Sequence, residues 1–347
     1  MRSTKPLVAA FILGLSSIAC DSVEDCPRVA EPGHGHAEAT WSHCAVAAPL
    51  SALAWSGSRF VAVGEGSPST TGSVLVSSDG LLWRPGQTPG PFDYWHLQGV
   101  TWAGSQFVAV GEMRVSGEFR PLIVTSPDGL AWTRRGVTIS PNSSITSVAW
   151  SGAQLVAAGP GTLLTSPDGV TWIGRQTPEG AILKGVTWGA SQFVAVGFGG
   201  PKFSPRIVTS SDGVIWTDRS APGSASLADV AWSGERFVAV GSGDAVLTSP
   251  DGVTWSPQGL HFGRDVLLTG VAWGASQFVA VGKIGRAPNW SGVILTSSDG
   301  IRWARMRAPD RGNAQDVAWS GSRFVAVGWL SRGSFATYHV GLISTSP

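Results

Sequence analysis

The sequence contains little charge and few reactive side chains. Charged residues make up 14% of its 347 residues, and the net charge is +1, so no anionic partner such as nucleic acid is favoured. There are only two tyrosines and three cysteines. No Walker A, HExxH or GxSxG motif and no paired CxxC occurs, and His34, His36 and His43 lack the spacing of a metal site. We therefore expect no cofactor and no bound metal.

Only one long apolar run occurs, and it lies near the N-terminus. Arg2 and Lys5 precede an apolar segment over residues 7–15, and small residues follow before Cys20. This layout is typical of a secretory signal peptide, and the run is too short for a mature membrane-spanning helix. The sequence predicts an exported chain, with a signal peptide over residues 1–19 and a flexible linker over residues 20–37.

The end of this segment, SSIAC, resembles the lipobox of bacterial lipoproteins. Ala19 and Cys20 match that pattern, whereas Ser17 stands where leucine is usual. The resemblance implies lipid attachment at Cys20 and a place in the cell envelope, either periplasmic or on the outer surface, with ordinary signal-peptidase cleavage as the alternative. Cys26 and Cys44 remain as an even pair in an oxidising compartment, which predicts a disulfide between them.

Glycine and tryptophan are abundant and follow a repeat. The unit V-x-W-x-G-x-x-F-V-A-V-G is followed, after a variable gap, by L/I-x-T-S-x-D-G-x-x-W. Its first tryptophan recurs 38 to 48 residues apart, at Trp55, Trp102, Trp150, Trp188, Trp232, Trp273 and Trp319. A unit of this length is the signature of a propeller blade, which cannot bury its own faces alone.

Each unit predicts four short strands, formed by the GVTW, FVAVG and ILTS segments and by the segment that ends in the second tryptophan. FVAVG barely alternates, so both of its faces should be buried between neighbouring blades. In S-x-D-G-x-x-W, the Ser and Asp side chains can accept hydrogen bonds from the turn, and glycine supplies a left-handed conformation. We expect this segment to form a self-contained turn.

This turn resembles the Asp-box, or BNR, repeat of the sialidase-like superfamily of β-propellers. The matching aspartates are Asp79, Asp128, Asp168, Asp212, Asp251 and Asp299. The resemblance implies an all-β fold, and it implies that these aspartates are structural and lie away from any active site.

The last unit lacks most of its Asp-box, because the sequence stops at TSP, residues 345–347. Trp41 precedes Trp55 by 14 residues, close to the 16 to 19 that separate other Asp-box tryptophans from the next unit. We therefore predict a seven-bladed propeller of four-stranded antiparallel blades over residues 38–347. An N-terminal strand at residues 38–41 would complete the last blade and close the ring.

Propeller loops alternate between two faces, and here the two faces differ. The first-to-second and third-to-fourth strand turns are short and uniform, whereas all length variation falls in the other loops. We name these the tight-turn face and the variable face, and expect ligand binding on the latter. Its candidate ligand-binding residues are Tyr94, Trp95, His96, Arg120, Arg264, Trp290, Trp329 and Tyr338. Aromatic rings with arginines suit sugars, carboxylates or phosphates, although the tryptophans could instead simply cover the barrel.

The family resemblance also raises the question of catalysis. Sialidases use a Tyr nucleophile with a Glu, an acid/base Asp and three Arg, but no motif assigns these roles around Tyr94 or Tyr338. Another glycosidase would need two carboxylates. Asp229 and Asp316 occupy equivalent positions of units 5 and 7, near the expected channel mouth, and are the candidate catalytic pair. Alternatively, each bonds backbone N–H groups at a strand start.

The sequence favours an exported, lipid-anchored, monomeric propeller that binds a carbohydrate or protein partner through its variable face, without catalysis and without nucleic acid. A glycoside hydrolase that uses the two channel-mouth carboxylates is the alternative. A third possibility, an assembly factor like the Asp-box propellers of photosynthetic complexes, rests on fold analogy alone.

Overall fold

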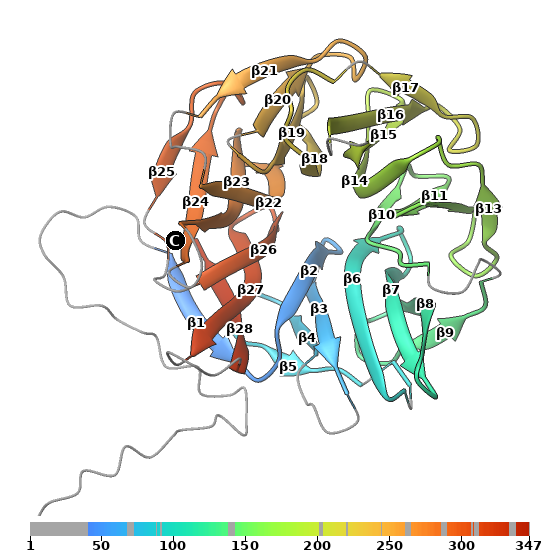
Figure 1. Cartoon of the computed structure of the whole chain (residues 1–347). Coiled ribbons are helices and arrows are strands. Elements are labelled where there is room, and N and C mark those ends of the chain that lie inside the picture. Colours follow the sequence, from blue (N-terminus) through green and yellow to red (C-terminus); the bar gives the residue numbers. More distant parts are fainter. Residues whose placement is uncertain are drawn as a thin grey trace, which may run out of the picture.

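In the computed structural model, the described residues are 41–346 without 68–72, 88, 91, 138–142, 201–203, 220, 244, 261–264, 286–289, 307, 309–311 and 333–337. These residues form strands and turns and contain no helix, so no helix that could cross a membrane is found among them. The sheets stand radially around a central axis, which is the architecture of a β-propeller (Figure 1). The all-β fold expected from the repeat is confirmed.

The strands follow one another in sets of four, from an inner strand at the axis to an outer strand at the rim. The inner strands are β2 (Leu50–Trp55), β6 (Tyr94–Trp102), β10 (Ser147–Trp150), β14 (Ala181–Gly189), β18 (Leu227–Trp232), β22 (Val266–Gly274) and β26 (Gly312–Trp319). The second strands are β3 (Phe60–Gly66), β7 (Phe107–Val115), β11 (Leu155–Gly159), β15 (Gln192–Gly199), β19 (Phe237–Gly241), β23 (Gln277–Ile284) and β27 (Phe324–Arg332).

The third and outer strands complete the sheets. The third strands are β4 (Val74–Ser77), β8 (Glu118–Ser126), β12 (Thr162–Ser166), β16 (Ser204–Ser210), β20 (Ala245–Ser249), β24 (Ser291–Ser297) and β28 (Tyr338–Thr345). The outer strands are β5 (Arg84–Pro85), β9 (Thr133–Arg135), β13 (Ile173–Arg175), β17 (Thr217–Arg219), β21 (Ser256–Gly259), β25 (Ala304–Met306) and β1 (Ser42–Val46).

Antiparallel pairing joins these strands into six sheets. Five sheets have four strands, and the sixth has eight because β3 pairs with β6 as well as with β2 and β4. The strand β1 pairs with β28, so that Ser42 lies opposite Thr345. It begins at Ser42, directly after Trp41, which is not part of a strand; the other residues of the predicted strand at residues 38–41 lie outside the described residues.

The outer strands also begin later in the sequence than the repeat pattern predicts. We expected the segment up to the second tryptophan to be the strand, but β5 begins at Arg84, directly after Trp83, and β9 begins directly after Trp132. The residues up to each tryptophan belong to the preceding turn, because the indole N–H bonds the turn's own glycine carbonyl, as from Trp83 to Gly80 at 3.1 Å.

The FVAVG strands form the core, buried on both sides as expected. In β3, Val61 and Val63 pack with residues of β6 and β7, whereas Phe60 and Ala62 pack with residues of β27. Alternate side chains of one strand thus enter two different interfaces between sheets. Burying each Val or Phe side chain stabilises the fold by about 1.5–3 kcal/mol.

The Asp-box sequence forms the turn that its residue types predict. In TSPDGVTW at residues 165–172, Ser166 Oγ accepts the Gly169 N–H at 2.8 Å, and Asp168 Oδ1 accepts the N–H groups of Val170 and Thr171, both at 2.8 Å. Gly169 has φ of 73°. Backbone N–H donors at Thr171 and Val170 hold the pKa of Asp168 below its usual value. All six turns repeat these bonds.

The two kinds of short turn lie on the same face, as expected, and they are bonded to each other. Arg59 Nη1 donates to the carbonyl of Asp128 in the next repeat at 3.0 Å, and Gln154 Nε2 donates to the carbonyl of Asp212 at 3.0 Å. Gln106, Gln192 and Arg236 make the same contact. In these five repeats the residue before the FVAVG strand therefore links neighbouring blades, a role that the sequence pattern did not reveal.

Candidate functional site

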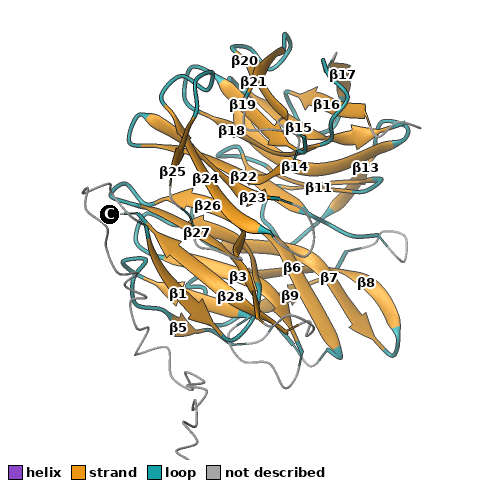
Figure 2. Ribbon diagram, turned by 60° about the vertical axis from the view of Figure 1, so that its left-hand side comes forward, coloured by secondary structure: helices purple, strands orange, loops and turns teal. Residues whose placement is uncertain are grey.

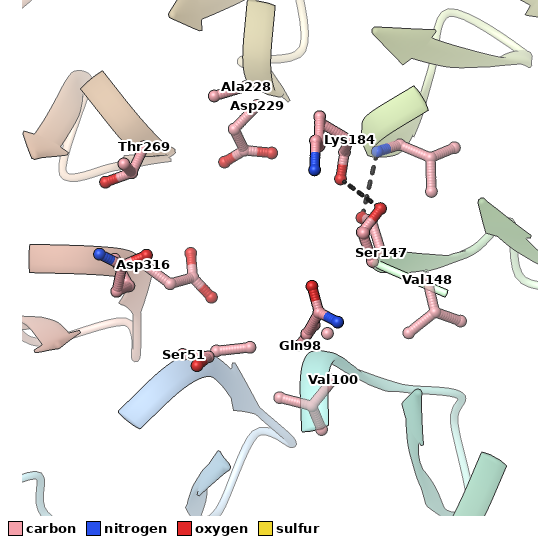
Figure 3. Close-up of a pocket in the computed structure, with 15 residues that line it drawn as sticks. Ser51, Gln98, Val100, Ser147, Val148, Lys184, Ala228, Asp229, Thr269 and Asp316 are labelled. Carbon is pink, nitrogen blue, oxygen red and sulfur yellow. Dashed lines mark hydrogen bonds between the residues drawn. The ribbon is translucent and has the colours of Figure 1, made fainter. Parts of the chain in front are cut away.

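The inner strands surround a cavity of about 190 Å³ on the axis of the molecule (Figure 3). Its lining comes from consecutive residues of the inner strands, namely Ser51, Ala52, Gln98, Gly99, Thr146, Ser147, Lys184, Ala228, Asp229, Thr269, Gln315 and Asp316, together with Val100, Val148 and Val186. Among these lining residues, Lys184 is the only cation, and Asp229 and Asp316 are the only carboxylates. The structure thus brings the predicted carboxylate pair to the axis.

Each of these carboxylates binds the backbone of the following repeat. Asp229 Oδ2 accepts the Val271 N–H at 2.9 Å, and Asp316 Oδ2 accepts the Leu53 N–H at 2.8 Å. Asp316 Oδ1 also accepts the N–H of its own neighbour, Val317, at 2.7 Å. The expected alternative, a strand-start hydrogen bond, is therefore present, and it extends across the interface between sheets.

In each case a glycine of the preceding repeat makes room for the carboxylate side chain. A Cβ atom on Gly185 would lie 2.8 Å from Asp229 Cα and 2.9 Å from its Oδ1, and one on Gly270 would lie 2.8 Å from Asp316 Cα. The alternation of Gly and Asp that singled out units 5 and 7 in the sequence is therefore a packing relationship between neighbouring repeats.

Protein surrounds both carboxylates except where they face the cavity. Burial raises the pKa of Asp229 to about 6. Burial, together with the charge of Asp229, raises the pKa of Asp316 to about 7. Ligand pockets usually measure about 300–1,000 Å³, so the cavity is small for a sugar substrate with an acid on each side of its bond. The geometry favours a structural role for both residues.

A second group of titratable side chains lies on the variable face between repeats 1 and 2. His96 on β6 is in register with Glu65 on β3 and Glu112 on β7, so all three side chains share one face of the sheet. His96 Nε2 lies 2.8 Å from Ser51 Oγ. Burial lowers the pKa of His96, although both glutamates oppose this effect.

The neighbouring tyrosine is also half-buried in this group. Burial, the charges of Glu65 and Glu112, and a hydrogen bond to Glu65 raise the pKa of Tyr94 to about 12. Tyr94 therefore keeps its proton at neutral pH and can act as a hydrogen-bond donor. Sequence reasoning found Tyr94 and His96, but it missed both glutamates because they are distant in the chain.

Trp95 requires a correction. Its side chain is 0% exposed and packs with Phe92 and Met113 in the core, and its Nε1 has no hydrogen-bond partner among the described residues. The prediction that Trp95 contacts a ligand is wrong. Residues 94–96 belong to β6 and are not a loop, so the side chain between Tyr94 and His96 points to the opposite, buried face.

The hairpin of β7 and β8 carries exposed side chains on the variable face (Figure 2). Its strands pair along their whole length, and β6 runs beside β7 as far as Arg114. Phe119 is 41% exposed, and its ring lies edge-on to Tyr94 with centroids 6.4 Å apart. Arg120 and Glu118 form an exposed ion pair at 2.8 Å. We call Tyr94, Arg114, Glu118, Phe119 and Arg120 the hairpin surface.

The other predicted ligand-binding residues are spread over other repeats. Trp290 lies beside Lys283, whose ammonium group is 4.3 Å from the ring centroid, and Trp329 is half-buried on β27. Tyr338 begins β28, but its side chain lies outside what the structure describes, as does the whole of Arg264. Among the predicted residues whose side chains the structure describes, Tyr94, His96 and Arg120 belong to repeat 2, whereas Trp290 and Trp329 lie in repeats 6 and 7.

The cysteine and histidine predictions concern the N-terminal part of the chain. Cys44 is disulfide-bonded. Cys20 and Cys26, like His34 and His36, lie outside the described residues, so the predicted Cys26 partner and the lipid attachment stay predictions. His43 Nδ1 lies 2.9 Å from Ser344 Oγ on β28. Within the described part of the chain, no three potential metal-ligating side chains come together.

Neither a protein-family model nor a curated protein sequence matches the chain. Solved structures do. A structure of YCF48 bound to D1 peptide has a TM-score of 0.63 at 15% identity over 93% of this chain and 97% of that one. YCF48 from Cyanidioschyzon merolae has 0.59 at 13% identity over 88% and 98%. The phage phi92 endosialidase has 0.52 at 11% identity over 87% and 67%. At these identities the likeness concerns the fold, and the chain is a β-propeller.

Proposed function

We propose that this chain is an exported, lipid-anchored propeller of the Asp-box type that binds a protein partner through its variable face and catalyses no reaction. The hairpin surface carries this proposal, because it combines an exposed aromatic edge with arginines, the residue types that dominate protein-binding hot spots. The likeness to a structure of YCF48 bound to D1 peptide supports a peptide or protein as the ligand.

The proposal includes seven blades in a closed ring, with the eight-stranded sheet counted as two blades. Four contacts between the two ends of the chain support closure. The strand β1 pairs with β28, and Trp41 is buried against residues of repeat 6. Asp316 bonds the Leu53 N–H, and Thr345 Oγ1 donates to the Gly80 carbonyl at 2.9 Å. A closed ring leaves no exposed sheet edge at the junction.

Site-specific crosslinking tests the binding face. We would place a photo-crosslinking phenylalanine analogue at Phe119 and, as the matched control, at Thr254 on the tight-turn face, in cells that make the full chain. We expect one dominant protein adduct at Phe119 that is absent at Thr254. The adduct should weaken when Arg120 is also replaced by Ala. The same adducts at both positions, or none at Phe119, would contradict the proposal.

A carbohydrate ligand is the competing binding hypothesis. A glycan array probed with the full chain and with a Tyr94→Ala/Trp290→Ala/Trp329→Ala variant separates the two. Selective glycan binding that the variant loses would favour the carbohydrate. The hydrolase alternative requires release of reducing ends that disappears in Asp229→Asn or Asp316→Asn. We expect no release, because both carboxylates already hold backbone N–H groups.

A further inference from the structure

The exposed apolar residues are unevenly divided between the two faces. Nine large hydrophobic side chains are exposed among the described residues, and only Phe119 belongs to the variable face. Seven of the others follow the glycine of an Asp-box turn, and the eighth, Ile173, begins the outer strand directly after one. The seven are Leu81, Leu82, Val170, Val214, Ile215, Val253 and Ile301.

These side chains are held outward by a rigid turn. In each Asp-box the carboxylate binds the N–H groups of the two residues after glycine, as Asp212 does for Val214 at 2.8 Å and Ile215 at 3.0 Å. Ile215 is 74% exposed and Leu82 is 65% exposed. Because the same turn recurs around the ring, the tight-turn face presents aliphatic side chains along most of its circumference.

The N-terminal segment joins the propeller at this same face. Ser42, the first residue of β1, lies opposite Thr345, whose Oγ1 bonds the carbonyl of the Asp-box glycine Gly80. Twenty residues separate Cys20 from Trp41, and a random chain of that length would average about 25 Å from end to end. The predicted disulfide between Cys26 and Cys44 would shorten this tether, because Cys44 lies in β1. An anchor at Cys20 would therefore hold the tight-turn face nearest to the membrane.

Charge does not favour anionic lipid on this face. Arg59, Arg236, Arg302 and Arg323 are the arginines of its described turns, and the six Asp-box aspartates together with Glu235 outnumber them. Attraction to a negatively charged surface would need an excess of basic residues. Any membrane contact made here must therefore come from apolar burial, for which electrically neutral headgroups are sufficient.

We propose that the tight-turn face rests on the lipid bilayer through its ring of Asp-box aliphatic side chains, so that the variable face points away from the membrane toward the partner. This inference rests on the proposed lipid attachment at Cys20. It assigns the tight-turn face a role in orienting the protein on the membrane, in addition to the role of its turns in folding.

Fluorescence on vesicles tests the orientation. The probe is an environment-sensitive fluorescent amino acid placed at Ile215 and, as the matched control, at Phe119, in the lipidated chain on vesicles of phosphatidylcholine and phosphatidylethanolamine. We expect a blue shift at Ile215 and several-fold stronger quenching there by a bilayer-embedded spin label than at Phe119. A second substitution, Leu82→Asn, should reduce the shift at Ile215, and raising the salt concentration should leave the shift unchanged.

The outcomes separate the two proposals. The mass of the mature chain reports whether Cys20 carries lipid. If it does not, the chain is coupled to the same vesicles through Cys20 and a maleimide lipid, and the orientation is still measured. A stronger signal at Phe119, or none at either position, overturns the inference. A shift at Ile215 that occurs in native membranes but not on protein-free vesicles also overturns it, because the face would then bind a protein.

Discussion

The tight-turn face and the variable face are built by the same repeats but constrained in different ways. On the tight-turn face, the Ser, Asp, Gly and Trp of each box are all engaged in hydrogen bonds within the turn, and the backbone of the box bonds to the neighbouring blade. A change there affects the fold. On the variable face, the tip of the β7–β8 hairpin carries exposed side chains, and a Cβ on its Gly117 would have nothing within 4 Å. Differences between repeats accumulate there because the fold tolerates them.

Two glycines with similar backbone conformation make this contrast measurable. Gly129 in an Asp-box has φ of 77°, and a Cβ there would overlap Val61 of the preceding repeat. Gly117 at the tip of the β7–β8 hairpin has φ of 87° and nothing within 4 Å of a Cβ. Replacing Gly129 with Ala should lower the free energy of unfolding by about 3 kcal/mol, and Gly117→Ala by about 1 kcal/mol. Urea unfolding measures both, and equal losses would contradict the comparison.

The axial cavity should make stability depend on pH. Folding raises the pKa values of Asp229 and Asp316 from 3.8 to about 6 and about 7. The unfolded chain therefore releases these protons at lower pH than the folded one, and the free energy of unfolding should fall as pH rises from 4 to 7, by about 2–3 kcal/mol for each carboxylate.

A conservative substitution isolates this effect. Asp316→Asn removes one titrating group while its amide oxygen can still accept the Leu53 N–H, so unfolding midpoints should vary less with pH than those of the unchanged chain. An exposed carboxylate, Glu118, serves as the control for substitution by the corresponding amide. A pH profile that is identical in Asp316→Asn and the unchanged chain would refute the assignment.

The sequence-based predictions are correct where the residue types within one repeat determine its local structure. The Asp-box turn, the buried FVAVG strands and the division into two faces follow from local residue types, and the structure confirms them. The predictions are wrong or incomplete where the position of a side chain depends on how strands pair. Trp95 was assigned to a loop because the sequence pattern does not show that β6 begins as early as Tyr94, which turns the Trp95 side chain toward the core. Glu65 and Glu112 reach His96 only through strand register, which no motif encodes.

A smaller difference is expected when one carboxylate is removed from each face. Asp168→Ala leaves the N–H groups of Val170 and Thr171 without their acceptor, and should cost about 1–2 kcal/mol of stability. Glu118→Ala removes only an exposed ion pair with Arg120 and should change stability by about 0.5 kcal/mol or less. Thermal unfolding of the two variants measures this difference. A loss in Glu118→Ala as large as that in Asp168→Ala would mean that the hairpin surface is part of the framework.

The smallest expected effect on stability comes from replacing one exposed apolar residue on each face, and these substitutions should separate the functions of the two faces. Val170 is 43% exposed and Phe119 is 41% exposed, so replacing either with Ser should change the free energy of unfolding by about 0.5 kcal/mol or less. If the faces differ as proposed, Phe119→Ser weakens partner capture and leaves contact with vesicles unchanged. Val170→Ser should do the reverse, because it removes one aliphatic side chain from the ring. Crosslinking yield, with the photo-crosslinking residue moved to Glu118, and spin-label quenching are measured on both variants. A change in both readouts for one variant would show that its effect passes through the fold and not through a face.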